Sequence, residues 1–225
     1  TSVPTDMNDP SWVVVYPETV NGNPANAKNV VRWLLHQPGF HTGDIFYGCG
    51  ELHVKYNSAI YDFYFPGCRL AEHTLKIIHY PTDLYKSPNN VIQREGTAYC
   101  IRKGKGKKLI HDVSNSILID GKSHAEVSKI FSKVERFISY DALTAYSRFA
   151  ALSGCVSIVI PDQNVSIEQW YPNEEDRWGI AYGLSDEAIA LASKTSHLVN
   201  RRIQQEEEKC HEDITRFLKD VDSYF

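Results

Sequence analysis

Residues 136–161, RFISYDALTAYSRFAALSGCVSIVIP, restrict the possible folds of this chain more than any other stretch. An apolar run at 137–140 precedes Asp141, whose side chain can cap a helix. Gly154 suits the end of that helix, and 155–160 is a β-branched run typical of a strand buried on both faces. The helix itself is predicted from apolar residues at spacings of three and four, which are Leu143, Tyr146, Ala150 and Ala151. Strand, helix and strand in such a short span predict a parallel βαβ unit and therefore an α/β fold.

Hydroxyl and acidic residues gather where the first strand of this unit gives way to the helix. A helix start offers free N–H groups and a positive dipole end, so with hydroxyls nearby it can hold a phosphate. A simpler interpretation, in which Asp141 and Thr144 only cap the helix, fits the same spacing. The candidate phosphate-binding residues of this corner are Ser139, Tyr140, Asp141, Thr144 and Ser147.

A second strand–loop–helix pattern opens the chain. Residues 12–16 read as a strand, and the turn residues Asn21, Gly22 and Asn23 follow it. Apolar residues between 27 and 35 at helical spacing predict a helix that ends at 37–39, QPG. The turn either faces a ligand at the carboxyl end of the strand or is a plain βα turn.

Turn residues divide the rest of the first half into short segments. Aromatic and apolar runs at 46–47, 61–65 and 75–80 are predicted to be short strands. Proline, serine and asparagine around residue 90 indicate a linker. We therefore expect a first α/β lobe over 1–90, a second lobe over 91–200 and a C-terminal helix over 201–225 that docks toward the first lobe.

A glycine-containing basic loop follows the predicted strand 97–101. Five of the seven residues in 102–108, RKGKGKK, are cationic and the other two are glycine. Glycines let a ligand approach the backbone, and lysine and arginine neutralise phosphate. A solvated basic turn is the alternative. We favour a phosphate site formed by Arg102, Lys103, Lys107 and Lys108, because this loop and the corner at 139–147 leave neighbouring strand ends of one predicted sheet.

The long segment between Pro161 and Trp178 is the last candidate. It is either a surface excursion or a loop that covers a substrate, in which case Arg177 and the nearby Tyr182 would line the cleft. Residues 117–119 are predicted to be a further strand, and the predicted helix at 123–134 begins with a capping box, Ser123 and Glu126.

Composition excludes several classes of function. A net charge of −4 argues against general nucleic-acid binding, and no apolar run is long enough to cross a bilayer. The five cysteines are scattered without a CxxC pair, which is typical of reduced thiols in a cytoplasmic protein. Cys49, His53, Cys68 and His73 match no familiar zinc spacing, so no metal is expected.

The stretch FISYDALTAYSRFAALSGCVSIVIPD, followed by IEQWYP and then by RWGIAYG, resembles the donor-binding lobe of GT-B-type glycosyltransferases. The resemblance is to those that assemble bacterial O-antigen and capsule glycans, with relatives in the glycan machinery of large DNA viruses. The segment VVVYPETVNGNPANAKNVVRWLLHQPG is similar to part of the other lobe in that group. These segments lie within residues 13–39 and 137–183, which together make up about a third of the chain.

The resemblance implies two facing Rossmann-like lobes, the N-terminal one abbreviated. It implies a nucleotide-sugar donor bound mostly by the second lobe, a glycan acceptor in the cleft, and neither a metal nor another cofactor. Arg102 and the lysines after it would hold the diphosphate, beside Asp141 and Thr144. Glu18 and Asp44, expected near strand ends of the first lobe, would be candidate bases if the enzyme inverts.

Two other functions fit the same sequence. One is a non-catalytic nucleotide- or glycan-binding module of a larger glycan-assembly protein. The other is a nucleotide-sugar epimerase of similar two-lobed shape.

Overall fold

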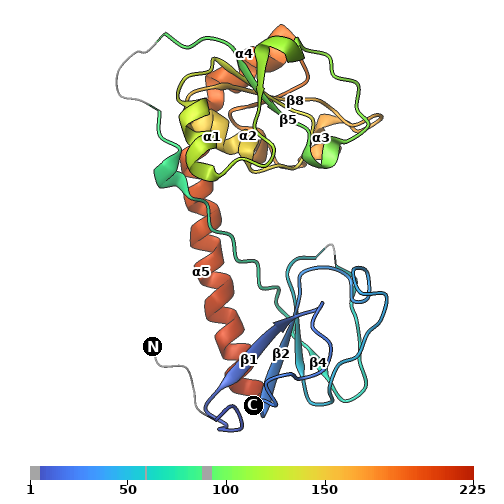
Figure 1. Cartoon of the computed structure of the whole chain (residues 1–225). Coiled ribbons are helices and arrows are strands. Elements are labelled where there is room, and N and C mark those ends of the chain that lie inside the picture. Colours follow the sequence, from blue (N-terminus) through green and yellow to red (C-terminus); the bar gives the residue numbers. More distant parts are fainter. Residues whose placement is uncertain (1–5, 59, 88–92) are drawn as a thin grey trace. The chain divides into compact units, whose positions relative to one another are not determined.

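The computed structural model describes residues 6–58, 60–87 and 93–225. The chain divides into two compact units, one of residues 1–79 with 206–225 and the other of residues 80–205 (Figure 1). The linker predicted around residue 90 falls outside the described residues. Each unit contains its own parallel sheet, so the described fold is α/β.

The first unit contains a four-stranded parallel sheet in the order β1-β2-β3-β4. Its strands are β1 (Val13–Pro17), β2 (Asn29–Leu34), β3 (Leu52–Lys55) and β4 (Arg69–Leu70). One face packs against the last turns of α5 (Val199–Tyr224), a helix whose residues from 206 onward belong to this unit (Figure 1). The shared core of that face contains Val31, Leu52, Val54, Phe217 and Val221.

The helix predicted within 24–37 is wrong, because this segment contains the buried strand β2. Val30 and Val31 are β-branched, and adjacent residues of β2 face opposite sides of a sheet that is covered on both sides, so apolar residues recur without alternation. The preceding turn is closed by Asn23, whose side chain bonds both the N–H and the carbonyl of Ala27. Asn26 adopts a φ of 49°, which a helix would not allow.

The short strands predicted at 46–47, 61–65 and 75–80 are also wrong. These runs form irregular loops, and the strands of the region are β3 and β4 instead. The rings of Tyr47, Phe63 and Phe65 pack around His53 of β3, with ring centroids 5.5 to 6.4 Å from the imidazole. The aromatic residues therefore cover the second sheet face from loops, without themselves pairing as strands.

A buried ion pair lies on that second face. Arg32 of β2 donates from Nε and Nη2 to both carboxylate oxygens of Glu51, at 2.9 and 2.8 Å, and the two side chains are 0% and 2% exposed. The same guanidinium donates to the carbonyls of Val20 and Gly22. The pair thereby ties the loop after β1 to the residue that precedes β3.

The second unit contains a five-stranded parallel sheet in the order β6-β5-β7-β8-β9. Its strands are β5 (Thr97–Cys100), β6 (Ser116–Leu118), β7 (Arg136–Ser139), β8 (Val156–Val159) and β9 (Ile180–Tyr182). Its helices are α1 (His124–Phe131), α2 (Tyr146–Leu152), α3 (Ile167–Trp170) and α4 (Asp186–Thr195), followed by the first residues of α5. The order corresponds to the 2-1-3-4-5 arrangement of doubly wound folds.

Most local predictions for this unit are confirmed. Strands occupy the predicted runs near 97–101, 117–119, 137–140 and 155–160, and α1 begins with the predicted capping box of Ser123 and Glu126. The segment after Pro161 is not a plain excursion, because it contains α3 with its own capping box, Ser166 and Gln169. Single-turn 3-10 helices complete the fold at Thr82–Leu84, Arg102–Gly104, Val113–Asn115, Glu174–Arg177 and Ser196–Leu198.

We expect Glu51→Gln to lower the free energy of unfolding of the first unit by about 3–5 kcal/mol, because it leaves the Arg32 charge buried without its partner. Hydrogen exchange of the β2 and β3 amides, with chemical denaturation, measures the loss. Asp62→Asn is the matched control, since Asp62 pairs with Lys55 at the surface, where an ion pair contributes little to stability. Equal effects of the two substitutions would contradict a structural role for the buried pair.

The same carboxylate predicts a pH dependence. Burial by itself would raise the pKa of Glu51. The His53 imidazole, 3.6 Å from Oε2, and the hydrogen bonds from Arg32 and the Gly48 amide outweigh burial and lower the pKa from 4.5 to about 2. A lowered native pKa stabilises the fold above the unfolded pKa, and this stabilisation is lost as the pH falls from 4.5 toward about 2. Denaturation of wild type and Glu51→Gln across this range should therefore show a stability difference that shrinks with acidification.

Candidate functional site

The strands β5 and β7 form a switch point in the second sheet, because the chain leaves them toward opposite faces. After β7, α2 packs Phe149 and Ala150 on the face that contains Cys100 and Phe137. After β5, the chain returns along the other face, where the His111 ring lies 4.7 Å from that of Tyr99. Ligands of open α/β sheets bind at the carboxyl ends of strands at such a point.

Arg102 and Asp141 meet at this switch point. Arg102 follows β5 and Asp141 follows β7, and Nε of Arg102 lies 3.7 Å from Oδ2 of Asp141. The arginine side chain is 46% exposed and the aspartate 7% exposed, so the guanidinium covers a carboxylate that is otherwise inside the protein. The guanidinium also lies over the Tyr146 ring, 5.3 Å from its centroid. Sequence reasoning placed these two strand ends on one edge, and the structure brings their side chains together.

The backbone of Arg102 is held in place by Asp120, at the carboxyl end of β6. The Asp120 carboxylate accepts the N–H groups of Ile101 and Arg102, at 3.2 and 2.9 Å to Oδ2. Arg102 has a φ of 42°, a left-handed conformation that costs energy in a non-glycine residue and needs such support. Sequence reasoning missed Asp120 and Tyr146. Asp120 was recognisable as an acidic residue directly after a predicted strand.

Asp141 does not cap α2, which corrects the helix start predicted from sequence. The helix begins at Tyr146 and has no side-chain cap, while Oδ1 of Asp141 accepts the Leu143 N–H at 3.2 Å. Residues 142–145 thus form a loop between β7 and α2. Within the described part of the chain, the N–H groups of Thr144 and Ala145 donate to no acceptor. The loop therefore offers two free donors on the Asp141 side of the switch point.

The basic loop crosses the end of β7, with Gly104 buried against it and most of the other loop residues exposed. A Cβ atom placed on Gly104 would lie 2.1 Å from the carbonyl oxygen of Tyr140, so the two backbones are in direct contact. Farther along, Nζ of Lys107 donates to the Ile160 carbonyl at 2.8 Å and pairs with Asp162 at 2.7 Å. The loop is therefore fixed to the carboxyl ends of both β7 and β8.

The four predicted cations have different surroundings. Arg102 faces Asp141, and Lys107 is occupied by Ile160 and Asp162. Lys103 and Lys108 are exposed and have no ion pair within the described residues. A bound anion would therefore meet Arg102, Lys103 and Lys108 more readily than Lys107.

Three residues predicted at the phosphate corner lie inside the protein. Ser139 is 0% exposed and donates to the Asp141 carbonyl, and Tyr140 is 0% exposed and accepts the Ile110 N–H. The Tyr140 hydroxyl also lies 2.7 Å from Nδ1 of His111, whose pKa is lowered by burial. The hydroxyl of Ser147 is buried without a hydrogen-bond partner in the described structure. These three buried side chains support the site without being exposed to a ligand, whereas Thr144 is partly exposed.

Arg177 precedes β9 and Tyr182 is its last residue, and both line a cavity of about 110 Å³ with Trp178 and residues of α4. Arg177 donates from Nε to the Tyr171 carbonyl at 2.7 Å, and Tyr182 donates to the Val165 carbonyl at 2.8 Å. Both side chains therefore fix the segment between β8 and β9.

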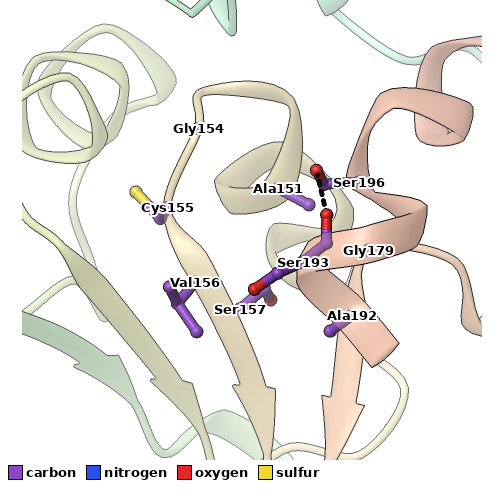
Figure 2. Close-up of a pocket in the computed structure, with 9 residues that line it drawn as sticks. All are labelled: Ala151, Gly154, Cys155, Val156, Ser157, Gly179, Ala192, Ser193 and Ser196. Atoms are coloured by element: carbon purple, nitrogen blue, oxygen red, sulfur yellow. Dashed lines mark hydrogen bonds between the residues drawn. The ribbon is translucent and has the colours of Figure 1, made fainter. Parts of the chain in front are cut away.

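Another cavity, of about 240 Å³, lies in the second unit at the amino ends of β8 and β9 (Figure 2). It is therefore at the end of the sheet opposite to the Arg102–Asp141 pair, which follows the carboxyl ends of the strands. Its lining is small and uncharged, with the three hydroxyl side chains of Ser157, Ser193 and Ser196. Ser196 donates to the Ser193 carbonyl at 2.9 Å, and the Ser157 hydroxyl is buried without a described partner. None of the described residues that line this cavity is cationic, so it lacks the charge-assisted donors that favour phosphate.

The candidate bases, both in the first unit, differ in exposure. Glu18 is 4% exposed, and its Oε2 accepts the Leu35 N–H at 3.0 Å, so the carboxylate closes the carboxyl ends of β1 and β2. Asp44 lies in an exposed loop. Of the two, Asp44 is the carboxylate that solvent or a substrate reaches directly.

The predicted cleft residues Asn21, Gly22 and Asn23 are occupied by internal contacts. Asn21 Oδ1 accepts the Phe46 N–H at 3.3 Å, and the Gly22 N–H donates to the Phe46 carbonyl at 2.6 Å. With the Asn23–Ala27 bonds and the contact between Gly22 and Arg32, these interactions shape the loop after β1.

The described residues contain no cluster of three or more histidine, cysteine, aspartate or glutamate side chains placed to hold a metal ion. No helix in the described part of the chain combines the length and apolar character that a bilayer span requires.

No protein-family model matches the chain, and no curated protein matches it significantly.

The contact between Gly104 and Tyr140 predicts that Gly104→Ala destabilises the second unit by about 3 kcal/mol, because an added methyl group meets backbone that cannot move aside cheaply. Gly106→Ala is the matched control. A Cβ at Gly106 would meet nothing within 4 Å. This substitution should therefore destabilise the unit only through the φ of +96°, by about 1–2 kcal/mol. Denaturant unfolding measures both, and a smaller loss for Gly104→Ala than for Gly106→Ala would contradict the close packing.

Proposed function

We propose that this chain is a glycosyltransferase that moves a sugar from a nucleoside-diphosphate sugar to a glycan hydroxyl in the assembly of a surface polysaccharide or glycoprotein glycan. The observation that carries the proposal is the meeting of Arg102 with Asp141 at the switch point, near the N–H groups of Thr144 and Ala145, which have no acceptor among the described residues. In this proposal the two α/β units are Rossmann-like lobes of the GT-B type, and residues 80–205 bind the donor.

The donor diphosphate would bind on the exposed side of Arg102. A guanidinium can donate two parallel hydrogen bonds to phosphate, and the amides of residues 144 and 145 add donors of fixed direction. Asp141 holds Arg102 in place and keeps its charge at the strand ends. Lys103 and Lys108, exposed on the same loop, supply positive potential in a protein whose net charge is −4.

These groups suit the chemistry of sugar transfer. As the bond between the anomeric carbon and the phosphate oxygen breaks, negative charge grows on the leaving nucleoside diphosphate. Preorganised cationic and N–H donors stabilise that charge more than they stabilise the intact donor, and this lowers the barrier. No step in this proposal requires a metal or another cofactor. Asp44 is the candidate that would accept the proton of the acceptor hydroxyl in an inverting reaction.

A non-catalytic nucleotide- or glycan-binding module is the second candidate, and the position of Glu18 favours it. Glu18 is buried and already accepts a backbone N–H, so it is a poor base. In that case the site around Arg102 would bind nucleotide without turnover.

Donor hydrolysis separates the two candidates. The purified chain is incubated with a panel of nucleotide-sugars, with and without glycan acceptors, and release of nucleoside diphosphate is followed. Steady release supports the transferase, and binding without release supports the module. Interconversion of the donor sugar without an acceptor would instead identify an epimerase.

The site predicts that Arg102→Ala and Lys103→Ala each weaken binding of a nucleoside diphosphate by about 1–3 kcal/mol, the cost of a lost charge-assisted hydrogen bond. Lys129→Ala is the matched control, because Lys129 is exposed in the last turn of α1, away from the carboxyl edge. Calorimetric titration measures affinity, and thermal unfolding checks that each variant is folded. Unchanged affinity in both loop variants would remove the phosphate site and with it the proposed function.

A further inference from the structure

Two thiols of the first unit lie on neighbouring turns. Cys49 is in the turn that precedes β3, where Gly50 has a φ of +78°. Cys68 ends the turn before β4, and its N–H donates to the Phe65 carbonyl at 3.0 Å. The Gly50 N–H donates to the Gly67 carbonyl at 2.8 Å, which holds the two turns together.

Contacts on both sides place the two sulfur-bearing side chains close together. Sγ of Cys68 donates to the Gly48 carbonyl oxygen at 3.0 Å. That oxygen and the Cα of Cys49 belong to one planar peptide, so Sγ of Cys68 lies within about 6 Å of this Cα. From the other side, a Cβ on Gly67 would lie 3.3 Å from the Cβ and 3.5 Å from the Sγ of Cys49. A disulfide spans Cα atoms about 4.4–6.8 Å apart, and these contacts keep the two cysteines on adjacent turns from which such a bond can be reached.

The two thiols differ in access. Cys49 is exposed, whereas Cys68 is partly buried. Burial raises the pKa of the Cys68 thiol and outweighs the backbone hydrogen bonds from Glu51 and Gly50, which lower it. Cys49 is therefore the thiol that an external reagent meets first, and Cys68 is positioned to react second.

We propose that Cys49 and Cys68 form a reversible disulfide when the chain meets a small-molecule disulfide such as oxidised glutathione. The Cys49 thiolate attacks one sulfur of the reagent, forms a mixed disulfide and expels one glutathione thiolate. The Cys68 thiolate then attacks the Cys49 sulfur and expels the second glutathione. The chain loses two protons and two electrons, and the reagent is reduced to two thiols.

The Cys49–Cys68 disulfide would restrain the loop that covers the second face of the first sheet. It closes residues 50–67, a segment that carries the exposed rings of Tyr61 and Tyr64, 80% and 77% exposed. It would also anchor the turn at Gly48, whose N–H donates to Glu51 at 2.7 Å. Closing a loop restricts the unfolded chain, so the oxidised first unit should resist denaturation better than the reduced one.

Mass spectrometry tests the proposal on the full chain. The reduced protein is treated with oxidised glutathione, free thiols are blocked, and peptides are mapped. The expected product has lost two hydrogens and contains a cross-linked peptide joining Cys49 and Cys68, with a higher denaturation midpoint that a reducing agent reverses.

Cysteine variants make the test specific. Cys49→Ser and Cys68→Ser should each abolish the cross-link and the rise in midpoint. Cys210→Ser, at a buried cysteine of the same unit, should leave both unchanged. Stable glutathione on Cys49 with Cys68 still free, or a cross-link to any other cysteine, would overturn the proposal.

Discussion

The parallel pairing of β5 with β7 is the constraint on which the candidate site depends. These strands are neighbours although β6 lies between them in the chain, so the segments that follow them depart toward opposite faces of the sheet. Arg102 and Asp141, which follow the two strands, come within 3.7 Å of each other at their carboxyl ends. The basic loop then crosses the edge only because Gly104 lacks a side chain where it meets Tyr140. Donors, a cation and its carboxylate partner gather at one point as a consequence of strand order.

The first unit differs from the second in how the two faces of its sheet are covered. Parallel strands need cover on both faces, yet no helix connects β1 to β4 in the described residues. α5 covers one face, and loops with aromatic rings cover the other. Loop backbone near a sheet face needs hydrogen-bond partners, and the Arg32 guanidinium supplies donors to two of these carbonyls while Glu51 balances its charge. The Arg32 side chain thus provides hydrogen bonds to loop carbonyls, whereas in a helix the backbone N–H groups provide them.

Prediction from sequence succeeded where local chemistry decided the outcome. Ser123 and Glu126 form a capping box that depends only on residues three apart, and the β-branched run at 155–160 forms a buried strand. It failed at β2, because a strand buried on both faces loses the alternation that distinguishes it from a buried helix. Prediction from sequence also failed for Asp141, whose carboxylate can either cap a helix or pair with a cation. Its partner Arg102 is distant in sequence, and the resulting ion pair replaced the expected cap.

The sequence by itself determined an α/β chain with a parallel βαβ unit, a basic glycine loop after one strand and an acidic, hydroxyl-rich corner after another. Only the tertiary structure decided which of these side chains a ligand can reach. Ser139, Tyr140 and Ser147 turn inward, Lys107 is occupied by Asp162, and Arg102 remains half exposed. The physical reason is that residue type fixes what a group can bond, whereas burial and the nearest partner, both set by strand order, decide whether that capacity is already used.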